Sequence, residues 1–245
     1  MRHRLVLWDV DHTLLDAGGA GLRLFRQAFT QRFGREFPPT RSLAGRTDRA
    51  IALEVLTTAG VADPRAQLDT FQGLIAGLAP QLGALVRAGG RVLPGAAEAL
   101  AAVAALDQQA RGQQAQGQQA RGIVQSVLTG NMRVLASVKL AALGLDPYLD
   151  LRVGAYGDAH EIRADLVPLA RASAAAAHGA DFSGDATVLI GDTPLDIEAA
   201  RVSGARAVGV ATGSFSTAEL AAAGADAVLL DLTSTQRVLA AIFPG

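Results

Sequence analysis

The chain has 245 residues, 50% of them hydrophobic, which is enough for the core of one domain with a smaller insertion. Its formal net charge is −1, so it lacks the basic surface that nucleic-acid binding requires. It contains no cysteine, which excludes disulfides, zinc–thiolate sites and a catalytic thiol. The N-terminus has no signal-peptide pattern, and no apolar run reaches the roughly 20 residues that cross a bilayer. We therefore expect a soluble, cytoplasmic protein that binds neither nucleic acid nor membrane, and no feature predicts a protein partner.

The first predicted element is a buried strand that ends in two carboxylates. An apolar run from Leu5 to Trp8 is followed by Asp9 and Asp11, one residue apart, and then by Thr13. Two carboxylates at the end of a strand repel each other unless a cation lies between them. The stretch is thus the first indication of a metal site.

Residues 16–89 are predicted to be helical, with no convincing strand. Apolar spacing favours helices over residues 19–33 and 47–59. A further helix is expected from Pro64, with Asp63 as its N-cap, to about residue 88, interrupted near Pro80. Gly18 and Gly19 suit a hinge at the start of this segment.

Strands and helices alternate over the remaining chain. Strands are predicted at residues 123–128, 151–155, 187–190, 206–210 and 227–230, and helices at residues 96–106, 132–143, 164–178, 195–203, 218–223 and 235–243. The alternation indicates an α/β fold with a Rossmann-like, doubly wound parallel sheet. We expect a core domain of residues 1–15 and 90–245, with residues 16–89 as an inserted all-helical domain.

Residues 108–122 are a low-complexity segment in which Gln-Gln-Ala recurs every five residues with regular glycines. The repeat has no apolar face, so it is predicted to be a surface loop of the core. A partner-binding tail is the alternative, and nothing in the residues supports it.

Polar residues follow four of the predicted strands, where ligands bind in a doubly wound sheet. They are Asp9 and Asp11, Thr129 and Asn131, Asp192 and Asp196, and Arg163. Carboxylates without histidine or cysteine favour a hard cation, most plausibly Mg²⁺. Three of these groups, all but Asp9 and Asp11, also have a structural explanation. Asp192 and Asp196 suit an N-cap and a first helical turn, Thr129-Gly130-Asn131 suits an N-cap or an anion site, and Arg163 suits an exposed arginine.

Taken in chain order, these motifs resemble those of the haloacid dehalogenase-like hydrolase superfamily. The resemblance rests on Asp9-Val10-Asp11-His12-Thr13, then Thr129, then a basic residue, then Gly191-Asp192-Thr193-Pro194-Leu195-Asp196. The helical insertion resembles the C1-type cap of that superfamily. The nearest subgroup is that of phosphoglycolate phosphatase-like and β-phosphoglucomutase-like hydrolases.

The resemblance implies a Mg²⁺-dependent phosphatase that acts on a small phosphorylated metabolite through an aspartyl-phosphate. Asp9 would be the nucleophile, and Asp11 the acid for the leaving group and then the base for water. It implies further that Mg²⁺ is held by Asp9, Asp192 and the backbone carbonyl of Asp11, with Asp196 orienting the metal shell, and that Thr129, Gly130 and Asn131 bind the phosphoryl group. In Gly45-Arg46-Thr47-Asp48, Arg46 would face the substrate, although Asp48 as a helix cap explains that segment equally well.

Two positions depart from the family pattern. His12 replaces the common glycine, and is either a substrate contact or a solvated side chain. The family's third motif is usually lysine, and the only lysine here is Lys139. Lys139 is expected to lie ~12 Å along its helix from the phosphate-binding end, which is too far, so Arg163 is assigned the catalytic role.

Three other functions remain open at this stage. A phosphotransferase of the sugar phosphomutase type would share the aspartyl-phosphate. A carbon–halogen hydrolase would use Asp9 but would need neither Asp11 nor Mg²⁺. A binding or regulatory protein would keep the fold with little turnover.

Overall fold

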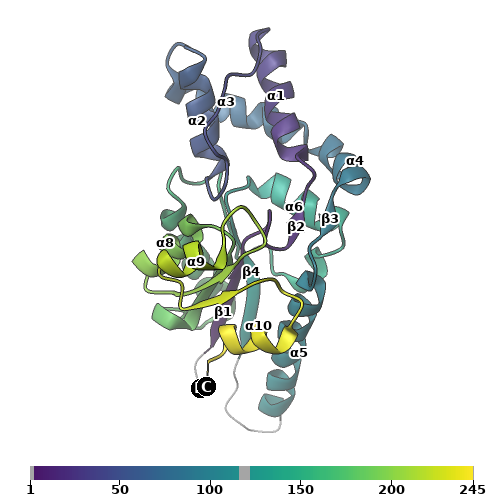
Figure 1. Ribbon diagram of the computed structural model, residues 1–245, viewed down its shortest axis with the longest axis vertical. Coiled ribbons are helices and arrows are strands. Elements are labelled where there is room, and N and C mark those ends of the chain that lie inside the picture. Colours follow the sequence, from purple (N-terminus) through teal and green to yellow (C-terminus); the bar gives the residue numbers. More distant parts are fainter. Residues whose placement is uncertain (1–2, 116–121, 245) are drawn as a thin grey trace.

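A six-stranded parallel sheet forms the centre of the molecule. The computed structural model describes residues 3–115 and 122–244. The strands lie in the order β5-β4-β1-β6-β7-β8. Figure 1 labels the neighbouring strands β1 and β4. Their bounds are β1 Arg4–Trp8, β4 Ile123–Thr129, β5 Ala155–Tyr156, β6 Thr187–Gly191, β7 Arg206–Val210 and β8 Ala227–Leu229. The chain builds outwards from β1 to β5 and then returns to β6, so the strand order reverses beside β1. The predicted doubly wound sheet is confirmed.

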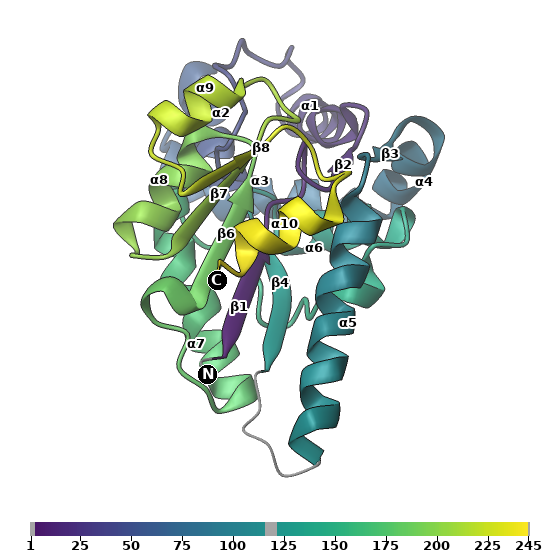
Figure 2. The same cartoon turned by 60° about the horizontal axis from the view of Figure 1, so that its bottom comes forward.

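Side chains of β1 alternate between two buried faces of the sheet, as expected for a parallel strand covered on both sides. Leu5 and Leu7 belong to the core on one face, and Val6 and Trp8 to the core on the other. The first face is covered by α7 (Leu166–His178), α8 (Pro194–Val202) and α9 (Thr217–Ala222). The second is covered by α5 (Ala96–Ala115) and α10 (Thr235–Ile242). Figure 2 shows α10 crossing in front of the sheet.

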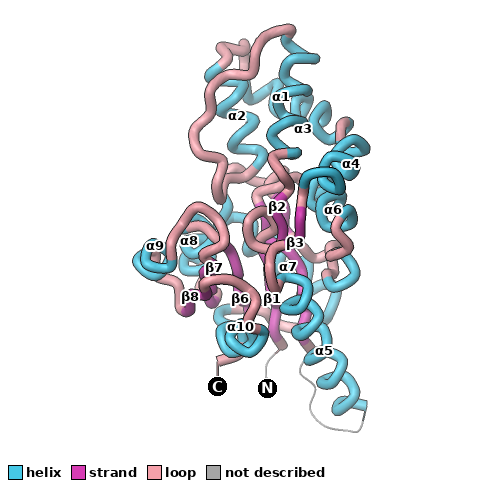
Figure 3. Tube along the Cα trace, turned by 45° about the vertical axis from the view of Figure 1, so that its right-hand side comes forward, coloured by secondary structure: helices cyan, strands magenta, loops and turns pink. Residues whose placement is uncertain are grey.

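The four helices of the insertion lie on the side of the sheet where β1 ends (Figures 1 and 3). They are α1 Ala20–Phe33, α2 Asp48–Thr58, α3 Pro64–Gly77 and α4 Ala79–Gly89. Asp63 caps α3 as predicted, because its carboxylate accepts the Ala66 amide at 3.2 Å. The chain breaks between α3 and α4 at Leu78, two residues before Pro80. Phe25, Phe29 and Phe71 join α1 to α3 through edge-to-face ring contacts.

The two connections between the insertion and the sheet run side by side. β2 (Leu15–Asp16) and β3 (Arg91–Val92) form an antiparallel pair, and Arg91 makes an ion pair with Asp16 at 2.8 Å. Gly18 has a φ of 60°, and a Cβ there would overlap the Gly89 carbonyl. The insertion therefore leaves and re-enters the core at one narrow place, where a hinge would be expected.

Two predicted elements differ from the structure. The surface loop expected at residues 108–122 is wrong for residues 108–115, which continue α5, while residues 116–121 lie outside the described part. Glutamine and alanine are good helix formers, and the single Gly112 costs only about 1 kcal/mol. The strand predicted at 151–155 is β5 at Ala155–Tyr156. A turn precedes it, in which the Val153 amide donates to the Asp150 carbonyl.

The remaining helix of the sheet domain is α6, Arg133–Ala142, which ends before Gly144 with a φ of 72°. It lies beside α4 of the insertion. Within the described ranges, no helix has the length and apolarity that a membrane crossing requires.

Candidate active site

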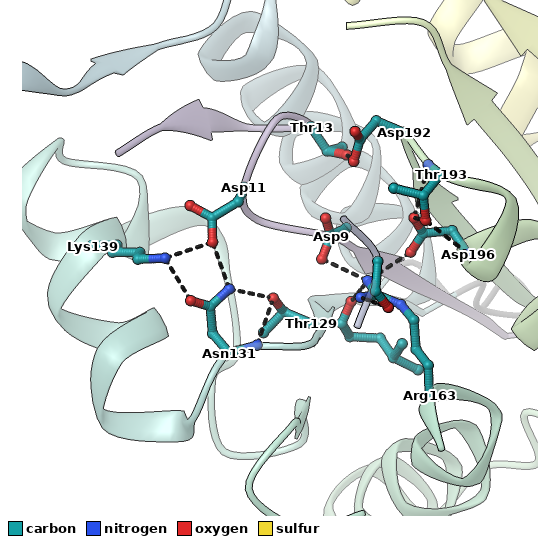
Figure 4. A network of polar contacts seen from close by, with 12 residues as sticks. Asp9, Asp11, Thr13, Thr129, Asn131, Lys139, Arg163, Asp192, Thr193 and Asp196 are labelled. Atoms are coloured by element: carbon teal, nitrogen blue, oxygen red, sulfur yellow. Dashed lines mark hydrogen bonds and ion pairs between the residues drawn. The ribbon is translucent and has the colours of Figure 1, made fainter. Parts of the chain in front are cut away.

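Residues from the ends of β1, β4 and β6 meet at a cavity of about 350 Å³ between the sheet and the insertion. The predicted site residues that line it are Asp9, Asp11, Arg46, Thr129, Gly130, Asn131, Arg163 and Asp192. Asp196 lies behind this wall, in contact with Arg163 and Thr193. Figure 4 shows the polar groups as two networks, one around Arg163 and one around Lys139.

The first network contains a carboxylate cluster, defined here as Asp9, Asp192 and Asp196. The three residues are buried, and each offers an oxygen within 4.8 Å of the others. Both oxygens of Asp196 are engaged, one by Arg163 at 2.6 Å and the other by the backbone amide and hydroxyl of Thr193 at 3.0 and 2.6 Å. Thr193, not Asp192, is the N-cap of α8. Capping therefore explains Asp196 in part and does not explain Asp192.

Burial raises the pKa values of two of these carboxylates, Asp9 and Asp192. For Asp9, burial outweighs the attraction of Arg163 and raises the pKa to about 6. For Asp192, burial together with the neighbouring charge of Asp9 raises the pKa to about 8. A cation bound between them would favour the ionised forms and lower both pKa values.

Arg163 lies between two members of the cluster. It begins a short helical turn before α7 and is 5% exposed. Its Nη2 donates to Asp9 Oδ1 at 2.6 Å and to the Leu128 carbonyl at 3.1 Å, and lies 2.6 Å from Asp196 Oδ1. Burial would lower the pKa of Arg163, but Asp196 and Asp9 outweigh it and raise that pKa. Arg163 is thus buried in the site and is not the exposed arginine that its position in the sequence also allowed.

The second network is centred on Lys139, and the expectation that Lys139 lies too far from the site is wrong. Its ammonium is 2.5 Å from Asp11 Oδ2 and 2.5 Å from Asn131 Oδ1, and the residue is 3% exposed. The error has a simple physical reason. The long Lys139 side chain extends back toward the N-terminal end of α6, as helical side chains do, and there it reaches the same Asp11 oxygen that Asn131 binds.

This network favours the ionised form of Asp11. Asn131 Nδ2 donates to Asp11 Oδ2 at 2.7 Å and to Thr129 Oγ1 at 2.9 Å. Burial would raise the pKa of Asp11, but the Lys139 ammonium and the hydrogen bonds from Lys139 and Asn131 outweigh it, and the pKa is lowered. The two aspartates at the end of β1 therefore have opposite pKa shifts, which makes them suited to different tasks.

The segment Gly45-Arg46-Thr47-Asp48 also differs from its predicted interpretation. Thr47 is the N-cap of α2, since its hydroxyl accepts the Ala50 amide at 3.2 Å. Asp48 instead accepts the backbone amide of Met132, in the core, at 2.7 Å. Arg46 lines the cavity and makes an ion pair with Glu54 at 2.7 Å.

Three further residues contribute: Thr13 and His12 belong to the motif after β1, whereas no sequence motif marks Gly213. Thr13 donates to Asp192 Oδ1 at 3.4 Å. Gly213 packs so closely that a Cβ there would overlap Asp192 Oδ2, which brings the loop after β7 against the cluster. His12 is exposed at the cavity with a φ of 61°, and its carbonyl accepts the Thr212 hydroxyl at 2.5 Å.

Comparison with known proteins gives a family model and structural neighbours. A family model described as haloacid dehalogenase-like hydrolase matches residues 6–201. No curated protein matches the chain. A hydrolase from Pseudomonas syringae has a TM-score of 0.62 at 21% identity, over 97% of this chain and 98% of that chain.

Two further solved structures superpose over nearly the whole chain. A predicted phosphatase from Clostridium acetobutylicum has a TM-score of 0.61 at 18% identity, over 98% of this chain and 99% of that chain. A protein named as a β-phosphoglucomutase, from Thermotoga maritima, has a TM-score of 0.56 at 19% identity, over 98% and 100%. At these identities the similarity establishes the fold.

Proposed function

Because this chain belongs to the haloacid dehalogenase-like hydrolase family, we propose that it is a Mg²⁺-dependent phosphatase of small phosphate esters. The observation that carries the proposal is the separation of Asp9 and Asp11 into two networks at one cavity, with Arg163 bound to Asp9 and Lys139 bound to Asp11. Such a pair supplies a nucleophile in one environment and a proton-transfer group in the other. The inserted helices would act as a cap over the reaction.

Asp9 is the proposed nucleophile. One Asp9 oxygen is held by Arg163, which fixes the carboxylate and leaves its second oxygen for attack on phosphorus. A new bond between that oxygen and phosphorus would replace the ester bond, and the alcohol would leave with a proton from the protonated form of Asp11, which becomes the carboxylate. Asp11 would then take a proton from the water that hydrolyses the aspartyl-phosphate. The lowered pKa of Asp11 favours this second role.

The carboxylate cluster fits a divalent cation. Three carboxylates against one guanidinium leave two negative charges, and all the donors are oxygens, which Mg²⁺ prefers. Asp9 and Asp192 would hold the ion together with the Asp11 carbonyl, whereas the two engaged oxygens of Asp196 suit an orienting role. The ion, when bound, would offset repulsion between Asp9 and the phosphate.

The loop after β4 would hold the transferring phosphoryl group. Thr129, Gly130 and Asn131 line the cavity just before the N-terminus of α6, where backbone amides favour anions. Arg163, bound to Asp9, would balance negative charge during the transfer.

The cap-side wall favours an ester with a partly apolar leaving group over a sugar phosphate. Leu22, Phe25, Leu43 and Ile51 line this wall. Arg46, the cation on the same side, is already paired with Glu54. Sugar hydroxyls packed against these four side chains would lack partners there, and each unpaired polar group costs about 1–3 kcal/mol, while Ser42 and Asp48 are polar side chains of the same wall. This observation favours the phosphatase over the sugar phosphomutase. The separate contacts of Asp9 with Arg163 and of Asp11 with Lys139 favour it over a carbon–halogen hydrolase or a binding protein.

The test is release of inorganic phosphate from a panel of phosphate esters with Mg²⁺. The wild type is compared with Asp9→Asn and with Asp69→Asn, a matched change at an exposed carboxylate of α3. We expect release by the wild type and Asp69→Asn and none by Asp9→Asn. Equal inactivity of all three would reject the enzyme, and transfer of phosphate to a sugar without net release would favour the phosphomutase.

A further inference from the structure

Asp48 joins the cap to the core at the edge of the cavity. Its backbone amide donates to the Gly130 carbonyl at 2.6 Å, and its carboxylate accepts the Met132 amide at 2.7 Å. The two bonds hold the chain on both sides of Asn131. Asp48 is 9% exposed and lines the same cavity, yet the proposed chemistry assigns it no step.

At this contact, amides at the N-terminal ends of two helices, α6 of the core and α2 of the inserted cap, each donate to an acceptor in the other part of the molecule. Helix α6 begins at Arg133 without a cap from its own N-cap side chain, and Asp48 of the cap supplies a carboxylate there. Helix α2 begins at Asp48, and its first two amides donate to the core carbonyls of Gly130 and Gly157, the second at 2.9 Å. Opening of the cap would break both sets of bonds at once.

Two neighbouring contacts belong to the same cap seat, defined here as the contact of residues 45–48 with the core. The Thr47 hydroxyl donates to the Glu161 carbonyl at 3.0 Å, two residues before Arg163. A Cβ at Gly130 would overlap the Arg46 carbonyl, so the two backbones meet directly. The cap segment therefore contacts the loops that carry Asn131 and Arg163, one from each network.

Helix α6 connects the seat to the proton-transfer group. Asp48 binds at the N-terminal end of α6, and Lys139, in the last turn, binds Asp11 at 2.5 Å and Asn131 at 2.5 Å. A shift of α6 or of the loop before it would move Lys139 and Asn131 relative to Asp11.

We propose that Asp48 is a positioning residue that couples cap closure to the placement of Asn131 and Lys139 around Asp11. The inference rests on the proposed phosphatase function. Asp48 touches no reacting atom in this scheme. Its carboxylate completes the network only when the cap is seated, so the acid–base group is fully ordered only over an enclosed substrate.

The experiment compares Asp48→Ala and Asp48→Asn with Asp63→Ala. Asp48→Asn keeps the shape and an acceptor oxygen for the Met132 amide. Asp63→Ala is the matched control, because it removes another helix cap from the cap domain, where the Asp63 carboxylate accepts the Ala66 amide and, among the residues that the structure describes, no amide of the core. Hydrolysis of p-nitrophenyl phosphate with Mg²⁺ gives kcat and KM, and hydrogen exchange of residues 129–136 reports the seat without requiring turnover.

We expect Asp48→Ala to lower kcat about 10- to 100-fold, the effect of losing a charge-assisted hydrogen bond, with faster exchange at residues 129–136. Asp48→Asn should recover part of both, and Asp63→Ala should change neither. Unchanged kcat and exchange in Asp48→Ala would overturn the inference, as would lowered kcat with unchanged exchange. If the wild type itself lacks turnover, the phosphatase proposal fails, and the exchange comparison still decides whether Asp48 orders the loop.

Discussion

The ammonium of Lys139 lies 2.5 Å from the carboxylate of Asp11, although 128 residues separate them in the chain. The two buried cations of the site are thus divided between the two aspartates that follow β1. Arg163 pairs with Asp9, and Lys139 pairs with Asp11. Each aspartate of this short motif has its own counter-charge.

Loss of the Lys139 charge should impair turnover and alter its pH dependence. Lys139→Met keeps the apolar stem but removes the ammonium that lowers the pKa of Asp11, so that pKa should rise. The acidic limb of the kcat–pH profile should move to higher pH, and kcat near neutral pH should fall by about tenfold or more. Arg133→Gln removes a charge from the exposed start of the same helix and should leave the profile in place. An unshifted profile in Lys139→Met would contradict a role for Lys139 beside Asp11.

Arg163 should be required for chemistry because it holds Asp9. Arg163→Ala should lower kcat/KM by about 10²–10³-fold at saturating Mg²⁺, as for removal of one preorganised donor. Arg163→Lys should retain part of the activity, since lysine keeps the charge but not the forked donor geometry that also reaches the Gly45 carbonyl. Steady-state kinetics on both variants measures the effect.

Arg171→Gln is the control for Arg163. Arg171 is a half-buried arginine that donates to Thr187 and Ser203, far from the carboxylate cluster in the fold. Its loss should lower the melting temperature while kcat/KM stays near the wild-type value. Equal kinetic losses in Arg163→Ala and Arg171→Gln would mean that destabilisation, not the contact with Asp9, explains the result.

Metal binding should be linked to pH through Asp9 and Asp192. Their pKa values of about 6 and about 8 lie above the unfolded value of about 3.9. The folded, metal-free protein therefore holds protons that the unfolded chain has released, and its free energy of unfolding should fall as pH rises from about 4 to about 8. Mg²⁺ binds the ionised forms, so the stabilisation by Mg²⁺ should grow over the same range.

Thermal melts with excess EDTA or saturating Mg²⁺, at about pH 5 and about pH 8, check this linkage. Burial raises the pKa of Asp48 to about 7, so Asp48 also lowers the free energy of unfolding as pH rises. This contribution is the same with EDTA and with Mg²⁺, and it cancels in the difference between the two melts. Asp192→Asn should weaken the growth of the Mg²⁺ effect with pH. A Mg²⁺ effect that is the same at both pH values would contradict proton release from the cluster.

Seating of the cap should require a glycine at position 45. Gly45 has a φ of 71°, and a Cβ there would overlap the Thr193 hydroxyl and lie 3.0 Å from Leu195 Cβ. Gly45→Ala should therefore raise KM and lower kcat/KM by about tenfold or more, because the cap cannot close on α8. Gly73→Ala, inside α3 with open space around it, should be active and more stable by up to about 1 kcal/mol. Wild-type kinetics in Gly45→Ala would show that this seat is not needed.

The sequence by itself determined the α/β fold and the edge of the sheet that carries the polar residues. The alternation of Leu5 to Trp8 between two buried faces is local, and so is the change from buried side chains to Asp9 and Asp11 where the strand ends. The parallel order then places the ends of β1, β4 and β6 together, so Asp9, Thr129 and Asp192 had to be neighbours.

Only the tertiary structure decided how charges and helix ends are paired. The position of Lys139 depends on how α6 lies against the chain after β1, and the role of Asp48 depends on the cap seating on a core helix. Each contact joins residues more than 80 positions apart, and its distance is set by helix packing instead of local periodicity. Helix periodicity along a single element carries no information about which residue of another element bonds to an uncapped helix end or pairs with a buried charge. For that physical reason the carboxylates, Asn131 and Arg163 could be found from the sequence, but which polar group pairs with which carboxylate could not.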